Sequence, residues 1–250
     1  MNCPKLRPVE AFPAEVGGQQ VVCLRDPHAF SDRVLLLPHP LFFIVSLFDG
    51  QHSILDIQAA FARRYGELLF REKLDEIVRE LDAAHFLEGS GFEAHREGVE
   101  AEFARSHIRR AALAGKSYEA DPGQLRIQID RFFEPPEGPG RPQSQDGGPQ
   151  IKGAVIPHID FARGGPCYGW AYKALMESCD ADLFVVLGTS HTGTRGPFAL
   201  TRKDYDTPFG VIPTDVSFVD RLIARCGPNL LLDEQAHRAE HSIEFQATLL

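Results

Sequence analysis

The chain has 250 residues, of which 43% are hydrophobic and 24% charged, and its formal net charge is −9. This length allows one large domain or two smaller ones with true hydrophobic cores. The acidic balance argues against a broad surface for polyanions, so nucleic acid is not expected as a partner. No apolar stretch approaches the roughly 20 residues needed to cross a bilayer, and no signal-peptide pattern opens the chain. We therefore expect a cytoplasmic protein without membrane contact.

The first part of the chain predicts a small α+β domain over residues 21–92. Residues 1 to about 20 show little periodicity and are expected to be a leader that docks on something or stays loose, with order beginning near Val21. β-like runs predict a hairpin, and helical spacing with Ser53 as a cap and Gly66 as an end predicts three helices. These elements are, in order, strands at 21–24 and 33–37, helices at 40–48, 53–65 and 72–85, and a short apolar pair at 86–87. The order favours a winged-helix-like domain.

Three segments of this first part carry a resemblance to a known family. They are Leu47-Phe48-Asp49-Gly50, Ser53-Ile54-Leu55-Asp56-Ile57 and the closing stretch from Leu81 to Leu87. Together they resemble the PqqD-like family of small winged-helix domains. That resemblance implies a peptide ligand and association with radical-SAM or other peptide-modifying enzymes. The alternative is an ordinary small helical domain with an aliphatic core.

The rest of the chain predicts a connector and a second domain. A charged helix is expected from Glu93 to Leu113, with residues 93–111 as the helical connector. Residues 112–250 follow strand and helix in alternation, which is typical of an α/β domain. Within it, the proline- and glycine-rich run 134–150 predicts a flexible insert. Gly164 and Gly165 are expected in a turn before a helix over 169–178.

Two apolar runs of the second domain each end in a histidine. Ile151 to His158 and Leu183 to His191 both have the pattern of a buried strand. In an open parallel sheet, ligands collect outside the carboxyl ends of the strands, so both imidazoles can converge there. His241 lies between acidic residues that can orient an imidazole. Three such histidines predict a metal site, although each could instead be hydrogen-bonded to a neighbouring loop.

Five motifs that follow one another in the second domain carry a second resemblance. They are Gly115-Lys116-Ser117-Tyr118, Pro157-His158-Ile159-Asp160-Phe161, Leu187-Gly188-Thr189-Ser190-His191, Thr207-Pro208-Phe209-Gly210 and Glu240-His241-Ser242-Ile243-Glu244. In this order they resemble the Memo family, which is also labelled AmmeMemoRadiSam system protein B. The resemblance implies a fold similar to the class III extradiol dioxygenases. It spans about residues 112–250.

The Memo resemblance implies a ligand set and a metal. His158, His191 and His241 match the histidines of the family motifs and are the expected ligands, with iron or copper as the cofactor, ahead of zinc. In the family a later cysteine completes the site and the domain continues further, so we expect this chain to end within the domain. Imidazole itself suits iron, copper, zinc and nickel alike.

Other residues of these motifs are expected to support the site. Asp160 could be an extra oxygen ligand, an acceptor for an imidazole or an ion-pair partner of Arg163, and we favour the last two. Cys167 precedes a helix and could be a reactive thiol, but we favour a plain small buried cysteine. Glu240 and Glu244 flank His241, and one of them could fix its tautomer, although Glu240 also suits a helix start.

The leading functional hypothesis is a Memo-like protein with a redox-capable or oxygen-related iron or copper centre, preceded by a peptide-binding domain. The resemblance implies radical-SAM and AMMECR1-like proteins as partners. One alternative is a non-catalytic adaptor that binds a peptide or protein. Another is a metal-dependent hydrolase, in which zinc acidifies a bound water. The sequence leaves open whether the protein is an enzyme and what its substrate is.

Overall fold

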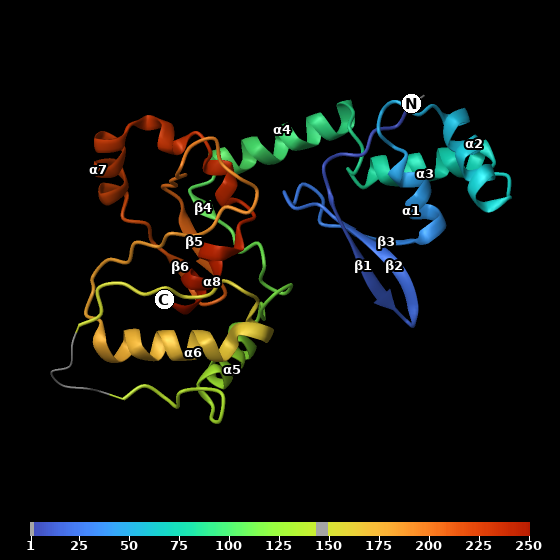
Figure 1. Cartoon of the computed structure of the whole chain (residues 1–250). Coiled ribbons are helices and arrows are strands. Elements are labelled where there is room, and N and C mark those ends of the chain that lie inside the picture. The colour runs from blue at the N-terminus through green and yellow to red at the C-terminus, as the bar shows by residue number, and fades with distance from the viewer. Residues whose placement is uncertain (1–2, 144–149) are drawn as a thin grey trace. The chain divides into compact units, whose positions relative to one another are not determined.

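The computed structural model describes residues 3–143 and 150–250. The chain forms two compact units, one up to Glu102 and the other from Phe103 onward (Figure 1). Among the described residues, no helix has both the length and the apolar character needed to cross a membrane.

The first unit opens with an antiparallel sheet in the order β1-β2-β3. Its strands are β1 (Glu10–Val16), β2 (Gln19–Arg25) and β3 (Val34–Pro38). The expected hairpin is present as β2 and β3. Strand β1 lies in the segment expected to be a leader and pairs with β2, so the leader is docked, and the expectation that order begins near Val21 was wrong. Gly17 and Gly18, both with positive φ, supply the tight turn that lets β1 pair with β2.

The residues before β1 are also held in place. Leu6 forms an isolated bridge with Leu87, and the guanidinium of Arg7 donates to the buried carboxylate of Asp26 at 2.7 Å. Arg7 also donates to the carbonyl of His85. The segment before β1 is therefore held by a β-bridge and by side-chain hydrogen bonds to distant residues. The composition of the segment gives no sign of these contacts.

Three helices follow the sheet as expected. They are α1 (His39–Ser46), α2 (Ile54–Tyr65) and α3 (Arg71–Ala83). Ser53 and Asp56 form a reciprocal capping box, and Gly66 ends α2 in the left-handed region. The apolar faces of these helices and the inner face of the sheet close one core, which includes Leu24, Ile57 and Leu74.

Helix α4 (Ser90–Arg105) differs in extent from the expected connector helix. It begins earlier and ends eight residues before Leu113. The reason is that residues 108 and 109 form strand β4 (Ile108–Arg109), which pairs in parallel with β5 (Asp204–Thr207). A two-residue strand leaves no periodic signal, so the helical pattern appeared to continue through it.

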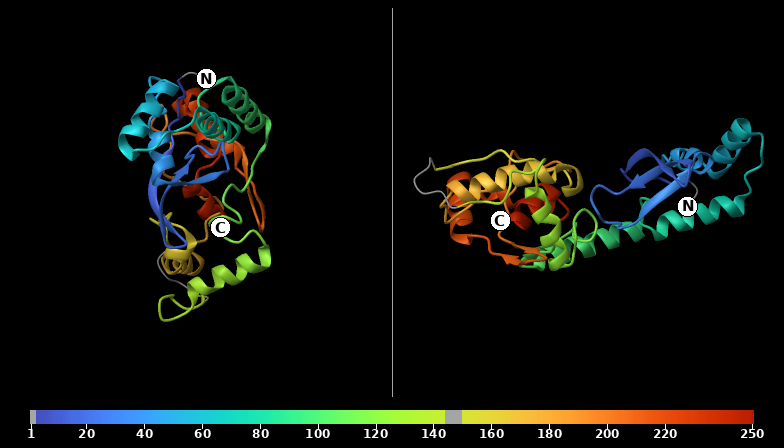
Figure 2. Two further views of the ribbon diagram at one scale, coloured as in Figure 1. Left: turned by 90° about the vertical axis from the view of Figure 1, so that its right-hand side faces the viewer. Right: turned by 90° about the horizontal axis from the view of Figure 1, so that it is seen from below.

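The second unit contains a small mixed sheet in the order β4-β5-β6, with β5 (Asp204–Thr207) and β6 (Gly210–Ile212) antiparallel. The turn predicted at Thr207 to Gly210 joins these two strands. Its helices are α5 (Pro122–Asp130), α6 (Phe161–Ser178), α7 (Val216–Cys226) and α8 (His241–Leu249), with short 3-10 turns at Arg131–Phe133, Pro228–Leu231 and Glu234–His237. Figure 2 shows α6 as a long, continuous helix.

An aromatic core joins α5, α6 and α8. It consists of Tyr118, Leu125, Phe132, Phe161, Tyr168, Tyr172 and Phe245. The turn expected at Gly164 and Gly165 is instead part of α6. A Cβ on Gly165 would lie 2.5 Å from the ring of Phe132. Glycine here serves close packing and not a turn, which explains the wrong expectation.

Two further expectations for this unit were wrong. The runs 151–157 and 183–187 form no strand among the described residues, and most of their side chains are exposed, including Val155 and Leu187. No described strand pairs with either run, so these apolar residues are not part of a buried sheet. The expected parallel sheet is therefore not what carries the histidines.

The described part of the 134–150 insert is fixed against α6. Lys173 donates to the carbonyl of Pro139, and the indole of Trp170 donates to the carbonyl of Glu137. The segment also bonds within itself, since the N–H of Gly138 donates to the carbonyl of Glu134 at 2.8 Å. The flexibility expected of the insert stays a prediction. Residues 144–149 of the predicted insert lie outside the described residues.

Candidate metal centre

The imidazoles of His158, His191 and His241 lie together in the second unit. One ring nitrogen from each falls within 4.8 Å of the others, and this is the one group of potential metal ligands found among the described residues. The ring centroids of His191 and His241 are 4.3 Å apart, and that of His158 is 5.2 Å from the ring of His191. His191 is exposed and the other two are half-buried, so the cluster is open to solvent.

Helix α8 is the element that brings these histidines together. His241 is its first residue, and side chains of its first two turns bond the two other histidine segments. The hydroxyl of Ser242 donates to the carbonyl of Thr189 at 2.8 Å, close to His191. The side-chain amide of Gln246 donates to the carbonyl of Pro157 at 2.9 Å, next to His158. One helix therefore anchors segments that are far apart in the sequence.

The close passage of the His191 segment over α8 depends on Gly188. A Cβ at this position would lie 2.5 Å from the hydroxyl oxygen of Ser242 and from the side chain of Ile243. Any larger residue would push the segment away from the helix. The glycine that precedes the Thr-Ser-His sequence thus lets the backbone pack closely on α8, and this packing sets the position of His191.

The backbone on each side of His158 is held by buried side chains. Gln246 binds the carbonyl before it, and the hydroxyl of Tyr168 donates to the carbonyl of Ile159 after it, at 2.8 Å. The hydroxyl of Tyr172 in turn donates to the side-chain oxygen of Gln246 at 2.9 Å. Burial raises the pKa of both tyrosines well above the usual range, so both hydroxyls keep their protons.

Glu240 caps α8 and also contacts His191. Its carboxylate accepts from the backbone N–H groups of His241 and Ser242 and, 49 residues away in sequence, from the N–H of His191 at 2.8 Å. Burial alone would raise the pKa of this carboxyl, but the hydrogen bonds from His191 and Ser242 outweigh it and leave the pKa below its usual value. The group is therefore an anion at neutral pH.

Asp160 lies at the start of α6. Its carboxylate accepts from the backbone N–H of Arg163 at 3.0 Å as a helix cap and forms an ion pair with the guanidinium of the same residue. It is not among the grouped ligand atoms. Cys167 is exposed on α6, so the expected buried thiol was wrong. The pairing of Asp160 with Arg163 is one of the two roles favoured from the sequence.

Glu244 lies in the interior and not among the grouped ligand atoms. Its fully buried carboxylate pairs with the guanidinium of Arg109 and accepts from the hydroxyl of Tyr118 at 2.6 Å. Neither Arg109 nor His237 is among the residues predicted from the sequence. His237 is buried, with Nδ1 2.9 Å from the hydroxyl of Tyr205. No local pattern marks contacts made across more than 100 residues.

The donor set fits a transition-metal ion. Three neutral imidazoles are suitable ligands for iron, copper or zinc, and a three-histidine face leaves positions open for water or a substrate. An anionic carboxylate that hydrogen-bonds a ligand imidazole is the usual second layer of such sites. Ligation by these residues stays a prediction.

Comparisons with known proteins agree with the motif order. A family model described as Memo-like protein matches residues 109–250. A MEMO1 family protein of Aquifex aeolicus is 30% identical over 247 residues, which covers 99% of this chain and 62% of that relative. A MEMO1 family protein of Methanopyrus kandleri is 38% identical over 146 residues, or 57% of this chain and 50% of that relative.

A third relative, a MEMO1 family protein of Methanothermobacter thermautotrophicus, is 35% identical over 144 residues, which cover 57% of this chain and 52% of that relative. No solved structure matches this chain. The chain thus spans between half and two thirds of the length of these curated relatives. The family match contains all three clustered histidines and extends over more than half of the residues. The chain belongs to the Memo family.

Proposed function

We propose that the second unit binds a transition-metal ion, iron or copper, through His158, His191 and His241. The observation that carries this proposal is that one ring nitrogen of each histidine lies within 4.8 Å of the other two. Two bonds of about 2 Å to one ion hold their nitrogens no more than about 4 Å apart, so the rings would need to close up by roughly 1 Å to share an ion. Exposure of His191 leaves the ion open to an exogenous ligand.

When bound, such an ion would supply redox or Lewis-acid chemistry at the surface of the second unit. The residues of the chain would orient the imidazoles, through Glu240, Ser242 and Gln246 on α8, and exclude water from the helix side of the site. We propose an oxygen-related or redox reaction within the AmmeMemoRadiSam system, with radical-SAM and AMMECR1-like proteins as partners. Family membership supports this assignment, and the substrate is left open.

The test is metal analysis of the purified chain. Bound metals are first removed, and all later steps are carried out without oxygen. The protein is reconstituted separately with iron(II), copper(II) and zinc(II), and bound metal is counted per chain. His158→Ala, His191→Ala and His241→Ala are each expected to lose the bound iron or copper. His107→Ala, which removes an exposed histidine of the same unit, is the matched control and should bind as the unmodified chain does.

Two results would contradict this proposal. The first is an unmodified chain that takes up none of these metals, and the second is full retention of metal in all three alanine variants. Stoichiometric zinc together with turnover of an ester or amide would favour the hydrolase alternative.

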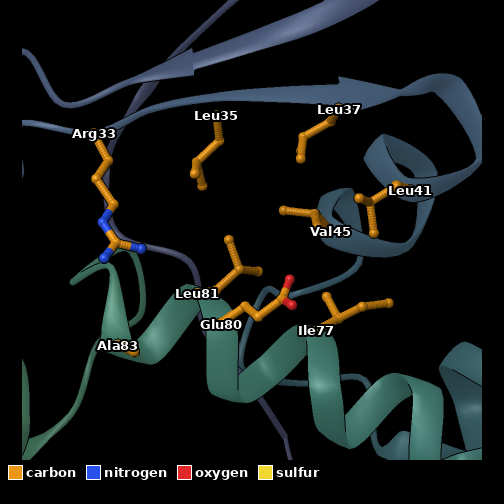
Figure 3. A pocket seen from close by; sticks show the side chains of 9 residues that line it. All are labelled: Arg33, Leu35, Leu37, Leu41, Val45, Ile77, Glu80, Leu81 and Ala83. Atoms are coloured by element: carbon orange, nitrogen blue, oxygen red, sulfur yellow. The ribbon is translucent and has the colours of Figure 1, made fainter.

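A second candidate function is peptide binding by the first unit, and a groove in that unit favours it. A cavity of about 320 Å³ lies between β3 and helices α1 and α3 (Figure 3). Its lining is mainly apolar, with Arg33 and Glu80 as charged members; the apolar residues are Leu35, Leu37, Leu41, Val45, Ile77, Leu81 and Ala83. In the described chain β3 pairs only with β2, so its other edge offers free backbone groups.

An open strand edge beside an apolar groove suits an extended peptide. The peptide backbone would pair with β3, and alternate apolar side chains would enter the groove. A displayed library of peptides with alternating apolar residues would provide the probe. Binding should be lost in Leu41→Glu, which charges the groove, and kept in Leu55→Glu, which charges an exposed site on α2. Equal binding by both variants would contradict this role.

A further inference from the structure

Glu240 is placed where two of the three histidines meet. Its side chain is 7% exposed and lies against His191 and His241. Nδ1 of His191 is 3.0 Å from one carboxylate oxygen and 3.2 Å from the other. Nδ1 of His241 is 3.3 Å from the same oxygen that receives the N–H groups of the helix. One anion therefore contacts both imidazoles.

The chemistry of a carboxylate decides which ring nitrogen of His191 carries the proton. An ionised carboxylate can only accept hydrogen bonds, so the nitrogen that faces it must be the donor. In a neutral imidazole the other nitrogen is then unprotonated and has a lone pair. For His191, Nδ1 carries the proton and Nε2 is the nitrogen available to a metal.

We propose that Glu240 is a positioning residue that fixes His191 as the Nδ1–H tautomer and directs its Nε2 to the metal. This inference rests on the proposed metal site. The carboxylate acts through the two histidines and not on the ion itself. Because the same group holds the backbone N–H of His191, it sets the position of the residue as well as the rotation of its ring.

A helix cap alone does not explain a glutamate at this position. Serine, threonine, asparagine and aspartate are the preferred capping residues, because their short side chains reach the first N–H groups. Four other helices described in the two units have a side-chain cap, and all four caps are short residues, namely Ser53, Asp121, Asp160 and Asp215. The longer side chain of Glu240 both caps α8 and reaches across to His191.

The first measurement needs no substitution and no metal. Two-bond proton–nitrogen NMR spectra of the metal-free chain, with the histidines labelled with nitrogen-15, report the tautomer of each ring. We expect His191 to be the Nδ1–H form. Assignment uses His191→Gln. A His191 ring in the Nε2–H form, or an equal mixture of the two forms, would overturn the inference whatever the chain does with metals.

The second measurement is the dissociation constant for cobalt(II), a spectroscopic probe, in Glu240→Ser and Glu240→Gln. Serine keeps a cap for α8 but removes the anion. Glutamine keeps the length of the side chain but places an N–H₂ group against the backbone N–H donors that the carboxylate binds. Loss of such a partner typically weakens metal binding about 10- to 100-fold. We expect this increase in both variants, together with loss of the single tautomer of His191.

Asp215→Ser is the matched control, since it changes an acidic cap of α7 that touches none of the three histidines. It should bind cobalt(II) as the unmodified chain does. Unchanged affinity in Glu240→Ser, with native helix content by circular dichroism, would overturn the inference. If the unmodified chain binds no metal, the proposed function fails, and the tautomer in the metal-free protein still decides the role of Glu240.

Discussion

The guanidinium of Arg109 on β4 and the carboxylate of Glu244 on α8 form an ion pair in which neither side chain has any exposed surface. The same guanidinium donates to the carbonyls of Glu240 and His237, at 2.7 and 3.0 Å. Arg109 thus holds the residues on both sides of His241. A small sheet and the helix that begins with a candidate ligand are joined through one buried charge pair.

Replacement of Arg109 by leucine should strongly destabilise the second unit. Glu244 would remain buried without its counter-charge, and removal of one partner of a buried pair typically costs about 3–5 kcal/mol. Urea unfolding can be followed by the fluorescence of Trp170, the single tryptophan of the chain, which lies in this unit. Arg163→Leu, at an exposed ion pair, should leave the midpoint unchanged. An equal midpoint for Arg109→Leu would contradict the importance of the pair.

Removal of the Tyr168 hydroxyl should loosen the segment that carries His158. Tyr168→Phe deletes the hydrogen bond to the carbonyl of Ile159, a loss of about 1 kcal/mol. If that bond holds His158 in position for a metal, the dissociation constant for cobalt(II) should rise roughly 3- to 10-fold. Hydrogen exchange at the neighbouring amides should also become faster.

Tyr205→Phe is the matched control for this prediction. It also removes a buried tyrosine hydroxyl, one that contacts His237 and not the histidine cluster. It should lower stability by a similar amount and leave the affinity for cobalt(II) unchanged. Equal affinities in both variants would mean that the Tyr168 hydroxyl supports only the fold.

Local signals predicted the helices of the first unit well, because each signal lies within the element that it defines. Ser53 with Asp56, and Gly66 with positive φ, determine the two ends of α2 through contacts a few residues apart. The segment around Arg7 could not be predicted in the same way. Its contacts with Asp26 and His85 join distant parts of the chain and leave no periodic pattern.

The histidine cluster was anticipated for a reason that the structure does not support. His158 and His191 were expected at the ends of parallel strands, yet neither preceding run is a strand among the described residues. They meet because Gln246 and Ser242 bind the backbone beside them. Motif order identified the residues, whereas the helix that organises them is found only from contacts.

The role of glycine shows the same limit. Sequence alone favours a turn wherever two glycines adjoin, as at Gly164 and Gly165. In the structure both lie inside α6, where the missing side chains admit Ile159 and Phe132. Whether a glycine serves a bend or a close contact depends on what lies against it, and that neighbour is remote in sequence.

Acid should destabilise the second unit through His237. Burial lowers the pKa of this imidazole, although its hydrogen bond to the carbonyl of Ala199 opposes the shift. The folded chain therefore binds fewer protons than the unfolded chain below the unfolded pKa of about 6.5, so stability falls as the pH drops through that value. Unfolding of the metal-free chain in urea, followed by Trp170 fluorescence, should give a lower midpoint at about pH 5.5 than at about pH 7.5.

Substitution of the histidine separates this effect from other titrations. His237→Gln should be less stable than the unmodified chain at neutral pH, because Tyr205 loses its partner, but its midpoint should fall less with acid. The exposed His107 provides the control, and His107→Ala should keep the full dependence on pH. A dependence that is the same in all three proteins would exclude His237 as its source.

A methyl group at Gly169 should disrupt the packing of α6 on the turn that carries Phe132. A Cβ there would overlap the backbone carbonyl of Phe132, and backbone cannot rotate away as a side chain can. Gly169→Ala should therefore lose about 1–3 kcal/mol of stability, although alanine favours helix. Gly98→Ala provides the contrast, since Gly98 lies on α4 with nothing within 4 Å of an added Cβ. That variant should gain roughly 0.5–1 kcal/mol. Urea unfolding followed by circular dichroism measures both changes, and a stabilised Gly169→Ala would show that the contact with Phe132 is not retained in solution.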